Sequence, residues 1–236
     1  MQAIRVIGLD ADDTLWHNES VFERVHQRYR ALLSQYHDAP TVDQALIETE
    51  RRNLSLYGYG VKGFTLSAIE TAIELTAGKI GTDEIRSILA SGREMLAHPV
   101  ELFEGVRETM AALAGNYRLI LITKGDLLHQ QSKLEKSGLA AHFQHIEIVS
   151  EKNPETYACI LKRLAIAPST FLMVGDSLKS DILPVLQIGG SAVHIPHCLQ
   201  WELDQTDQKP SAPGRFFELQ SITALPPLLS APTLQI

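Results

Sequence analysis

The chain has 236 residues, of which 44% are hydrophobic and 21% are charged, and its formal net charge is −7. These values are typical of a globular protein with one large domain, or with a core domain and a smaller one. The negative charge argues against general binding of nucleic acid, but it does not exclude a phosphorylated small substrate. The opening residues show no signal-peptide pattern, no apolar segment is long enough to span a membrane, and the two cysteines form no spacing motif. We therefore expect a cytoplasmic protein without membrane association.

The chain opens with a short apolar run, from Ile4 to Leu9, that ends in three acidic residues within four positions. Such a run is consistent with a buried strand of a parallel sheet. Ligands bind these sheets beyond the carboxyl ends of the strands, where Asp10 and Asp12 would reach them. Clustered carboxylates repel one another unless a hard divalent cation lies between them. This stretch therefore predicts a metal-binding edge.

Residues from about 16 to 97 are predicted to form an all-helical block. Apolar residues recur at helical spacing in four stretches, at about 19–36, 41–56, 67–77 and 82–96. Between the second and third stretches, residues 57–64 contain three glycines and are predicted to form a loop. This loop is either a flexible link between helices or a substrate-recognising loop whose Lys62 reaches the phosphate.

After Pro99 the pattern alternates between strands and helices. Strands are predicted at 119–122, 146–149, 171–174 and 191–195, and helices at 106–113, 127–139, 154–164 and 178–187. An edge strand at 215–219 and a short helix at 222–229 are predicted to follow. Alternating strands and helices indicate a parallel sheet with helices on both faces.

Polar residues stand at the carboxyl ends of three further predicted strands. Thr123 and Lys124 end one, Lys152 follows the next, and Asp176 follows a third. In a parallel sheet these groups and the acids of the first strand would meet at one edge. The carboxylates suit Mg²⁺, and the lysines and the threonine suit phosphate oxygens. A carboxylate that attacks phosphorus would form an aspartyl-phosphate. Taken singly, each residue has a structural alternative, such as a helix cap or a solvated surface charge.

In type and order, these motifs resemble those of the haloacid dehalogenase-like hydrolase superfamily. Its first motif is similar to residues 10–15, its second to Thr123, its third to Lys152 and its fourth to 175–181. The sequence departs from the family pattern twice, with Asp13 where glycine is commoner and Asn153 between Lys152 and the following proline. The resemblance implies a three-layer, Rossmann-like α/β core of residues 1–15 and 98–236, with a helical cap inserted at 16–97.

The resemblance also implies roles for individual residues. Asp10 would attack phosphorus, while Asp12 would protonate the leaving oxygen and then activate the hydrolytic water, a contribution of about 10²–10⁴-fold. Thr123 would donate a hydrogen bond to a phosphoryl oxygen, and Lys152 would neutralise charge on the phosphoryl group.

The same resemblance implies a Mg²⁺ site. Its ligands would be the Asp10 and Asp176 side chains and the main-chain carbonyl of Asp12. Asp181 would reach the ion directly or through water.

Asp12 also distinguishes two chemistries of the family, because an alkoxide leaving group needs a proton and a halide does not. Its presence favours hydrolysis of a phosphate ester. The resemblance implies a small phosphorylated metabolite, of the phosphoglycolate or nucleotide class, because a closing cap leaves little room for a protein chain. Two alternatives remain: a phosphosugar mutase that uses the same aspartyl-phosphate, and a catalytically silent phosphate-binding or protein-interaction module. The oligomeric state cannot be predicted from the sequence.

Overall fold

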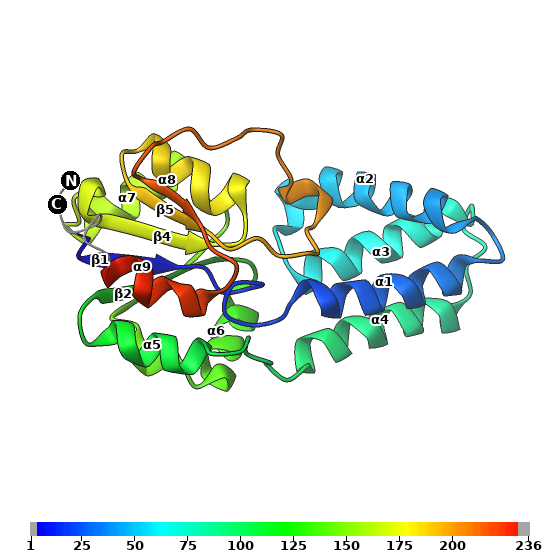
Figure 1. Ribbon diagram of the computed structural model, residues 1–236. Helices are drawn as coiled ribbons and strands as arrows, with labels where there is room; N and C mark the ends of the chain where they lie inside the picture. The colour runs from blue at the N-terminus through cyan, green and yellow to red at the C-terminus, as the bar shows by residue number, and fades with distance from the viewer. Residues whose placement is uncertain (1–3, 231–236) are drawn as a thin grey trace. The chain divides into compact units, whose positions relative to one another are not determined.

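The computed structural model describes residues 4–230, and the chain divides into two compact units (Figure 1). One unit is formed by the chain up to His17 together with the chain from Val100 onward, and the other runs from Asn18 to Pro99. The first is an α/β core and the second is all helical.

The α/β core is built on a six-stranded sheet in the order β3-β2-β1-β4-β5-β6, with every pair of neighbours parallel. The strands are β1 (Val6–Leu9), β2 (Arg118–Lys124), β3 (His145–Val149), β4 (Phe171–Gly175), β5 (Ser191–His194) and β6 (Phe216–Glu218). The predicted parallel sheet is confirmed, and its first strand lies in the middle. Gly8 in β1 has no room for a side chain, because a Cβ there would lie 2.6 Å from the Phe171 ring.

Helices cover both faces of this sheet, as predicted. Alternate residues of β2 enter opposite cores, so Leu119 and Leu121 pack on one face and Ile120 and Ile122 on the other. The first face is covered by α5 (Val106–Ala114), α6 (Leu127–Ser137) and α9 (Leu225–Ser230), and the second by α7 (Pro154–Arg163) and α8 (Leu183–Gln187) (Figure 1).

The helix predicted at 178–187 is not a single α-helix. It begins with η3, a π-helical turn over Leu178–Ile182, and continues as α8. Pro184 lies in the first turn of α8, where a missing backbone N–H costs least. The short helices η1 (Ala140–His142), η2 (Pro168–Thr170), η4 (Glu202–Asp204) and η5 (Ile222–Ala224) were not separated by the sequence pattern.

The helical unit consists of α1 (Glu19–Leu33), α2 (Ala39–Tyr57), α3 (Val61–Leu75) and α4 (Thr82–Ala97). Its own hydrophobic core includes Tyr29, Leu46, Phe64 and Met95. The predicted helices are therefore present, although their bounds differ. Helix α2 begins at Ala39 rather than at Thr41, because the side chain of Asp38 caps it by accepting a hydrogen bond from the Thr41 backbone N–H.

The predicted loop at 57–64 is wrong in extent, because only residues 58–60 lie between α2 and α3. Gly58 and Gly60 adopt positive φ angles of 69° and 106°, which a glycine adopts without strain. Gly63 lies in the first turn of α3, and a Cβ there would lie 2.7 Å from the Gly58 carbonyl oxygen. Two glycines therefore form the turn, and the third lets the helix pack against it. Lys62 is exposed in the same helical turn, and its expected contact with substrate stays a prediction.

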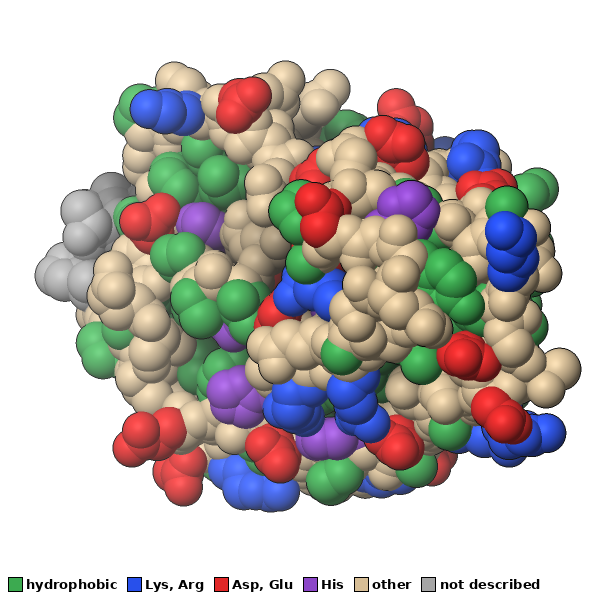
Figure 2. Space-filling view, turned by 90° about the vertical axis from the view of Figure 1, so that its right-hand side faces the viewer, with side chains coloured by type: hydrophobic (Ala, Val, Ile, Leu, Met, Phe, Trp, Pro, Cys, Tyr) green, Lys and Arg blue, Asp and Glu red, His purple; other side chains and the backbone are tan. Residues whose placement is uncertain are grey.

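No helix in residues 4–230 is long and apolar enough to cross a bilayer. On the face shown in Figure 2, acidic and basic side chains are interspersed among hydrophobic ones.

Candidate active site

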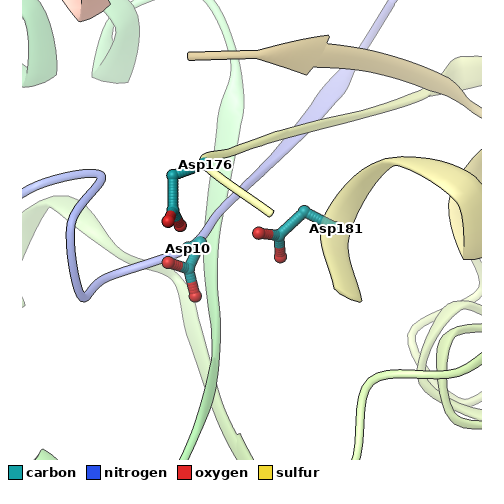
Figure 3. Close-up of side chains that lie close together, drawn as sticks. All are labelled: Asp10, Asp176 and Asp181. Carbon is teal, nitrogen blue, oxygen red and sulfur yellow. The ribbon is translucent and has the colours of Figure 1, made fainter. Parts of the chain in front are cut away.

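Three aspartates meet at the carboxyl edge of the sheet (Figure 3). Strands β1 and β4 are neighbours in register, so Asp10 and Asp176, which follow them, come together. Asp181 reaches the same place from η3. One carboxylate oxygen of each of the three lies within 4.8 Å of the others. Gly175 makes this approach possible, because a Cβ there would lie 2.3 Å from the Asp181 carboxyl carbon.

Lys152 is buried beside this cluster, with only 4% of its surface exposed. Its ammonium group donates to Asp10 and, over 2.7 Å, to Asp181. Lys152 lies between β3 and α7, directly before Asn153, which is the N-cap of α7. The Asn153 side-chain oxygen accepts a hydrogen bond from the Thr156 backbone N–H over 2.8 Å. The unusual residue between Lys152 and Pro154 therefore caps the helix and leaves the lysine in the site.

The electrostatics of the cluster are unbalanced, because it holds three carboxylates and one ammonium group. Burial, together with the charge of Asp181, raises the pKa of Asp10 from 3.8 to about 7, even though Lys152 acts to lower it. Burial and the charges of Asp10 and Asp181 raise the pKa of Asp176 well above its ordinary value. Burial acts to lower the pKa of Lys152, but Asp10 and Asp181 outweigh it, so the ammonium stays charged.

A divalent cation would relieve this imbalance. The donor set consists of carboxylate oxygens, which hard ions such as Mg²⁺ and Ca²⁺ prefer to softer nitrogen and sulfur ligands. The crowded carboxylates thus fit the metal site that the sequence predicts at this edge.

Asp12 lies in a different environment, although only Ala11 separates it from Asp10. Lys133 on α6 donates to both carboxylate oxygens, over 2.8 Å and 2.9 Å. Gln130, one turn earlier, donates to Oδ2 over 3.1 Å, and the Trp16 indole N–H donates to Oδ1. Burial acts to raise the pKa of Asp12, but the charge of Lys133 and these hydrogen bonds outweigh it and lower the pKa below its ordinary value.

The turn after Asp12 explains the acidic residue at position 13. Asp13 has a φ of 58°, a left-handed conformation that favours glycine and that aspartate adopts more readily than most other residues. Thr14 then turns its hydroxyl toward the Asp10 and Asp176 carboxylates, at 3.3 Å and 3.4 Å.

Thr123 and Lys124 end β2, but their side chains have different surroundings. The Thr123 hydroxyl is buried, accepts from the Gln130 amide over 2.9 Å and donates to the Lys124 carbonyl oxygen over 3.4 Å. Lys124 donates to Ser180 and to Asp204, each over 2.7 Å. These two contacts hold the Lys124 ammonium against η3 and η4. Its expected contact with substrate stays a prediction.

Sequence reasoning missed Gln130, Lys133, Asp204 and Trp16 in this region. The first two lie three positions apart on α6, and that spacing places polar side chains on one face of a helix. Two polar residues at this spacing, on the helix that follows a strand ending in motif residues, are the sequence signal that could have found them. Asp204 lies in the short helix η4, and no sequence pattern points to it.

Comparison with known proteins identifies a matching family and several relatives of this chain. A family model described as "haloacid dehalogenase-like hydrolase" matches residues 4–189. The human N-acylneuraminate-9-phosphatase is 26% identical over 98% of this chain and 96% of its own length. The glyceraldehyde 3-phosphate phosphatase of Pyrococcus furiosus is 30% identical over 42% of this chain and 44% of its own length.

A solved structure resembles the whole chain. It is that of a haloacid dehalogenase-like family hydrolase from Xanthomonas campestris, which is 44% identical, with a TM-score of 0.86. The similarity covers 97% of this chain and 91% of that one. The chain therefore belongs to the haloacid dehalogenase-like hydrolase family.

Proposed function

We propose that this hydrolase is a Mg²⁺-dependent phosphatase that cleaves a small phosphomonoester through an aspartyl-phosphate on Asp10. The observation that carries the proposal is the position of Asp10. Its carboxylate lies between two further carboxylates and a buried lysine, at the sheet edge where ligands bind.

Asp10 is the nucleophile of the first step. Its carboxylate oxygen forms a bond to phosphorus while the bond from phosphorus to the substrate oxygen breaks. Asp12, in its protonated form in the substrate complex, supplies the proton that this oxygen takes up. In the second step Asp12 takes a proton from water, whose oxygen attacks phosphorus and releases inorganic phosphate and free Asp10. Both steps balance without an oxidant or a reductant.

Lys152 and Thr123 bind the phosphoryl group during these steps. Lys152 contacts Asp10 directly, so its charge acts both on the nucleophile and on the phosphoryl oxygens beside it. Thr123 donates its hydroxyl proton to a phosphoryl oxygen, and Gln130 holds that hydroxyl from the other side.

Mg²⁺ would be held by the side chains of Asp10, Asp176 and Asp181 and by the main-chain carbonyl of Asp12. When bound, it would neutralise charge on the phosphoryl group and on the crowded carboxylates.

Phosphate ester hydrolysis is favoured over carbon–halogen cleavage because of Asp12. A halide leaves without a proton, whereas an alkoxide needs one, and Asp12 would supply it. The names of the two curated relatives support a phosphoric monoester hydrolase, since both describe phosphatases of small phosphorylated molecules. The helical unit would act as a cap that excludes water from the reaction.

Hydrolysis of p-nitrophenyl phosphate tests the proposal. We expect p-nitrophenol release that depends on Mg²⁺, is abolished by EDTA and returns when Mg²⁺ is added in excess. Asp10→Asn should reduce kcat by about 10⁴-fold or more, as expected for loss of a nucleophile. Activity that survives Asp10→Asn would rule out the assigned nucleophile.

The same assay, extended to a panel of phosphorylated metabolites, distinguishes the alternatives. A phosphatase releases inorganic phosphate in proportion to substrate consumed. A mutase converts a sugar phosphate into its isomer and releases little phosphate. A silent module releases none from any compound.

A further inference from the structure

One face of α6 supplies two donors to the Asp12 carboxylate. Lys133 bridges both of its oxygens, and Gln130, one turn earlier, donates to Oδ2. The Lys133 side chain is only 12% exposed, so this ion pair is largely shielded from water. With the Trp16 indole on Oδ1, each carboxylate oxygen receives two donors.

These donors fix the orientation of the carboxylate. A carboxylate contacted on one oxygen can still rotate about its side-chain bonds, whereas one held on both oxygens from two directions cannot. Proton transfer needs the acid within hydrogen-bond distance of the reacting oxygen, and a displacement of about 1 Å can cost roughly 100-fold in rate. The held orientation therefore matters to the reaction.

Gln130 connects this acid to the end of β2. Its amide nitrogen also lies 2.9 Å from the Thr123 hydroxyl and 2.7 Å from the Lys124 carbonyl oxygen. Gly125 leaves space for the Gln130 side chain, because a Cβ there would lie 3.3 Å from it. The φ of Gly125, +134°, is also one that residues with a side chain rarely adopt. The proton donor and the phosphate-binding hydroxyl are thus held by the same helix.

We propose that Lys133, assisted by Gln130, is a positioning residue that aims the Asp12 carboxylate at the leaving-group oxygen. The inference rests on the proposed phosphatase function. It assigns Lys133 no contact with substrate: the residue acts through Asp12. Its loss should therefore harm those substrates whose leaving group needs a proton.

The test compares kcat/KM for two substrates. Glycerol 2-phosphate has an alkoxide leaving group that needs a proton, whereas p-nitrophenolate is stable as an anion at neutral pH. We expect Lys133→Met to lower kcat/KM for glycerol 2-phosphate by roughly 10-fold to 100-fold, and for p-nitrophenyl phosphate by less than about 3-fold. Asp12→Asn removes the acid itself, so it should show the same selective loss of kcat/KM, and the loss should be larger than that of Lys133→Met.

Three further variants make the test specific. Lys133→Arg keeps the charge and two donors and should restore part of the loss on glycerol 2-phosphate. Lys133→Gln removes the charge but keeps a donor, so it should show the same selective pattern with a smaller loss, and it serves if Lys133→Met does not fold. Lys136→Met removes an exposed lysine of the same helix and should change neither value.

Equal losses on both substrates would overturn the positioning role, and so would an increase in activity on glycerol 2-phosphate. These outcomes are distinct from failure of the proposed function, in which the wild-type protein hydrolyses neither substrate in the presence of Mg²⁺.

Discussion

Two groups of acidic side chains at the same edge of the sheet differ in their electrostatics. In the cluster of Asp10, Asp176 and Asp181, burial and mutual repulsion raise the pKa of Asp10 to about 7 and the pKa of Asp176 well above its ordinary value. Asp12 lies two residues from Asp10, yet its pKa is lowered, because Lys133, Gln130 and Trp16 surround its carboxylate with donors.

The difference shows that the fold, not the residue type, decides what a carboxylate does. The three-aspartate cluster contains less positive charge than negative charge, which makes it a place for a metal ion. The charge of the Asp12 carboxylate is already balanced by Lys133, which makes this side chain a poor ligand for a cation. Its lowered pKa favours the ionised form, which is the form that accepts a proton. Four experiments can test this contrast.

The largest effect is expected from Lys152→Met. The substitution leaves the buried carboxylates of Asp10 and Asp181 without their ammonium partner, so we expect the free energy of unfolding to fall by about 3–5 kcal/mol in EDTA. Urea denaturation measures this value, and Lys136→Met is the exposed control. Mg²⁺ should restore part of the loss, because it supplies positive charge at the same place. A loss no larger than the control's would show that the cluster does not need the ammonium.

The second effect is stabilisation by Mg²⁺. An ion that binds the folded chain alone stabilises it by about 2.7 kcal/mol at 100 times its dissociation constant. We expect the thermal midpoint to rise when EDTA is replaced by excess Mg²⁺, and Asp176→Asn to weaken that rise. NaCl at matched ionic strength is the control, and an equal rise in NaCl would contradict a specific site.

The third effect concerns two aspartate-to-asparagine substitutions, both measured without metal. We expect one of them to increase the stability of the fold and the other to decrease it. Asp176→Asn removes one charge from a crowded group and should raise the thermal midpoint. Asp12→Asn removes the partner of Lys133 and should lower stability by about 1–3 kcal/mol. Thermal unfolding in EDTA measures both, and shifts of the same sign would remove the contrast between the two regions.

The fourth effect is the pH dependence of the metal-free protein. Asp10 has a pKa of about 7 in the folded chain and 3.8 as its ordinary value, so between these pH values the folded state holds more protons than the unfolded state. Its contribution to stability therefore falls as pH rises from about 4 to about 7 and is constant above that range. Asp12 contributes in the opposite direction: its lowered pKa gives stability that is lost as pH falls below 3.8.

Urea midpoints at pH 5 and pH 7.5 in EDTA measure the Asp10 contribution. Asp10→Asn should flatten the fall between these pH values, and a fall unchanged in that variant would show that other groups cause it.

Much of the fold could be predicted from sequence because its signals are local. An apolar run that ends in polar residues marks a strand, and alternation with helical periodicity marks a parallel sheet. The helix caps were harder to predict: α2 begins at Ala39, with Asp38 as its cap, rather than at Thr41. Gly63 broke the helical pattern, yet it lies inside α3, because its missing side chain lets the chain approach Gly58 closely. Such an approach depends on how α2 and α3 pack against each other, which a local sequence pattern does not contain.

The sequence by itself determined the sheet, the helical insertion and the motif residues Asp10, Asp176 and Lys152 at the ends of strands, because strand and turn preferences act between near neighbours in the chain. Only the tertiary structure decided which carboxylates share one place and which side chain neutralises Asp12. Lys133 stands 121 positions from Asp12 along the chain, and only the packing of α6 against the sheet brings its ammonium to within 3 Å of that carboxylate.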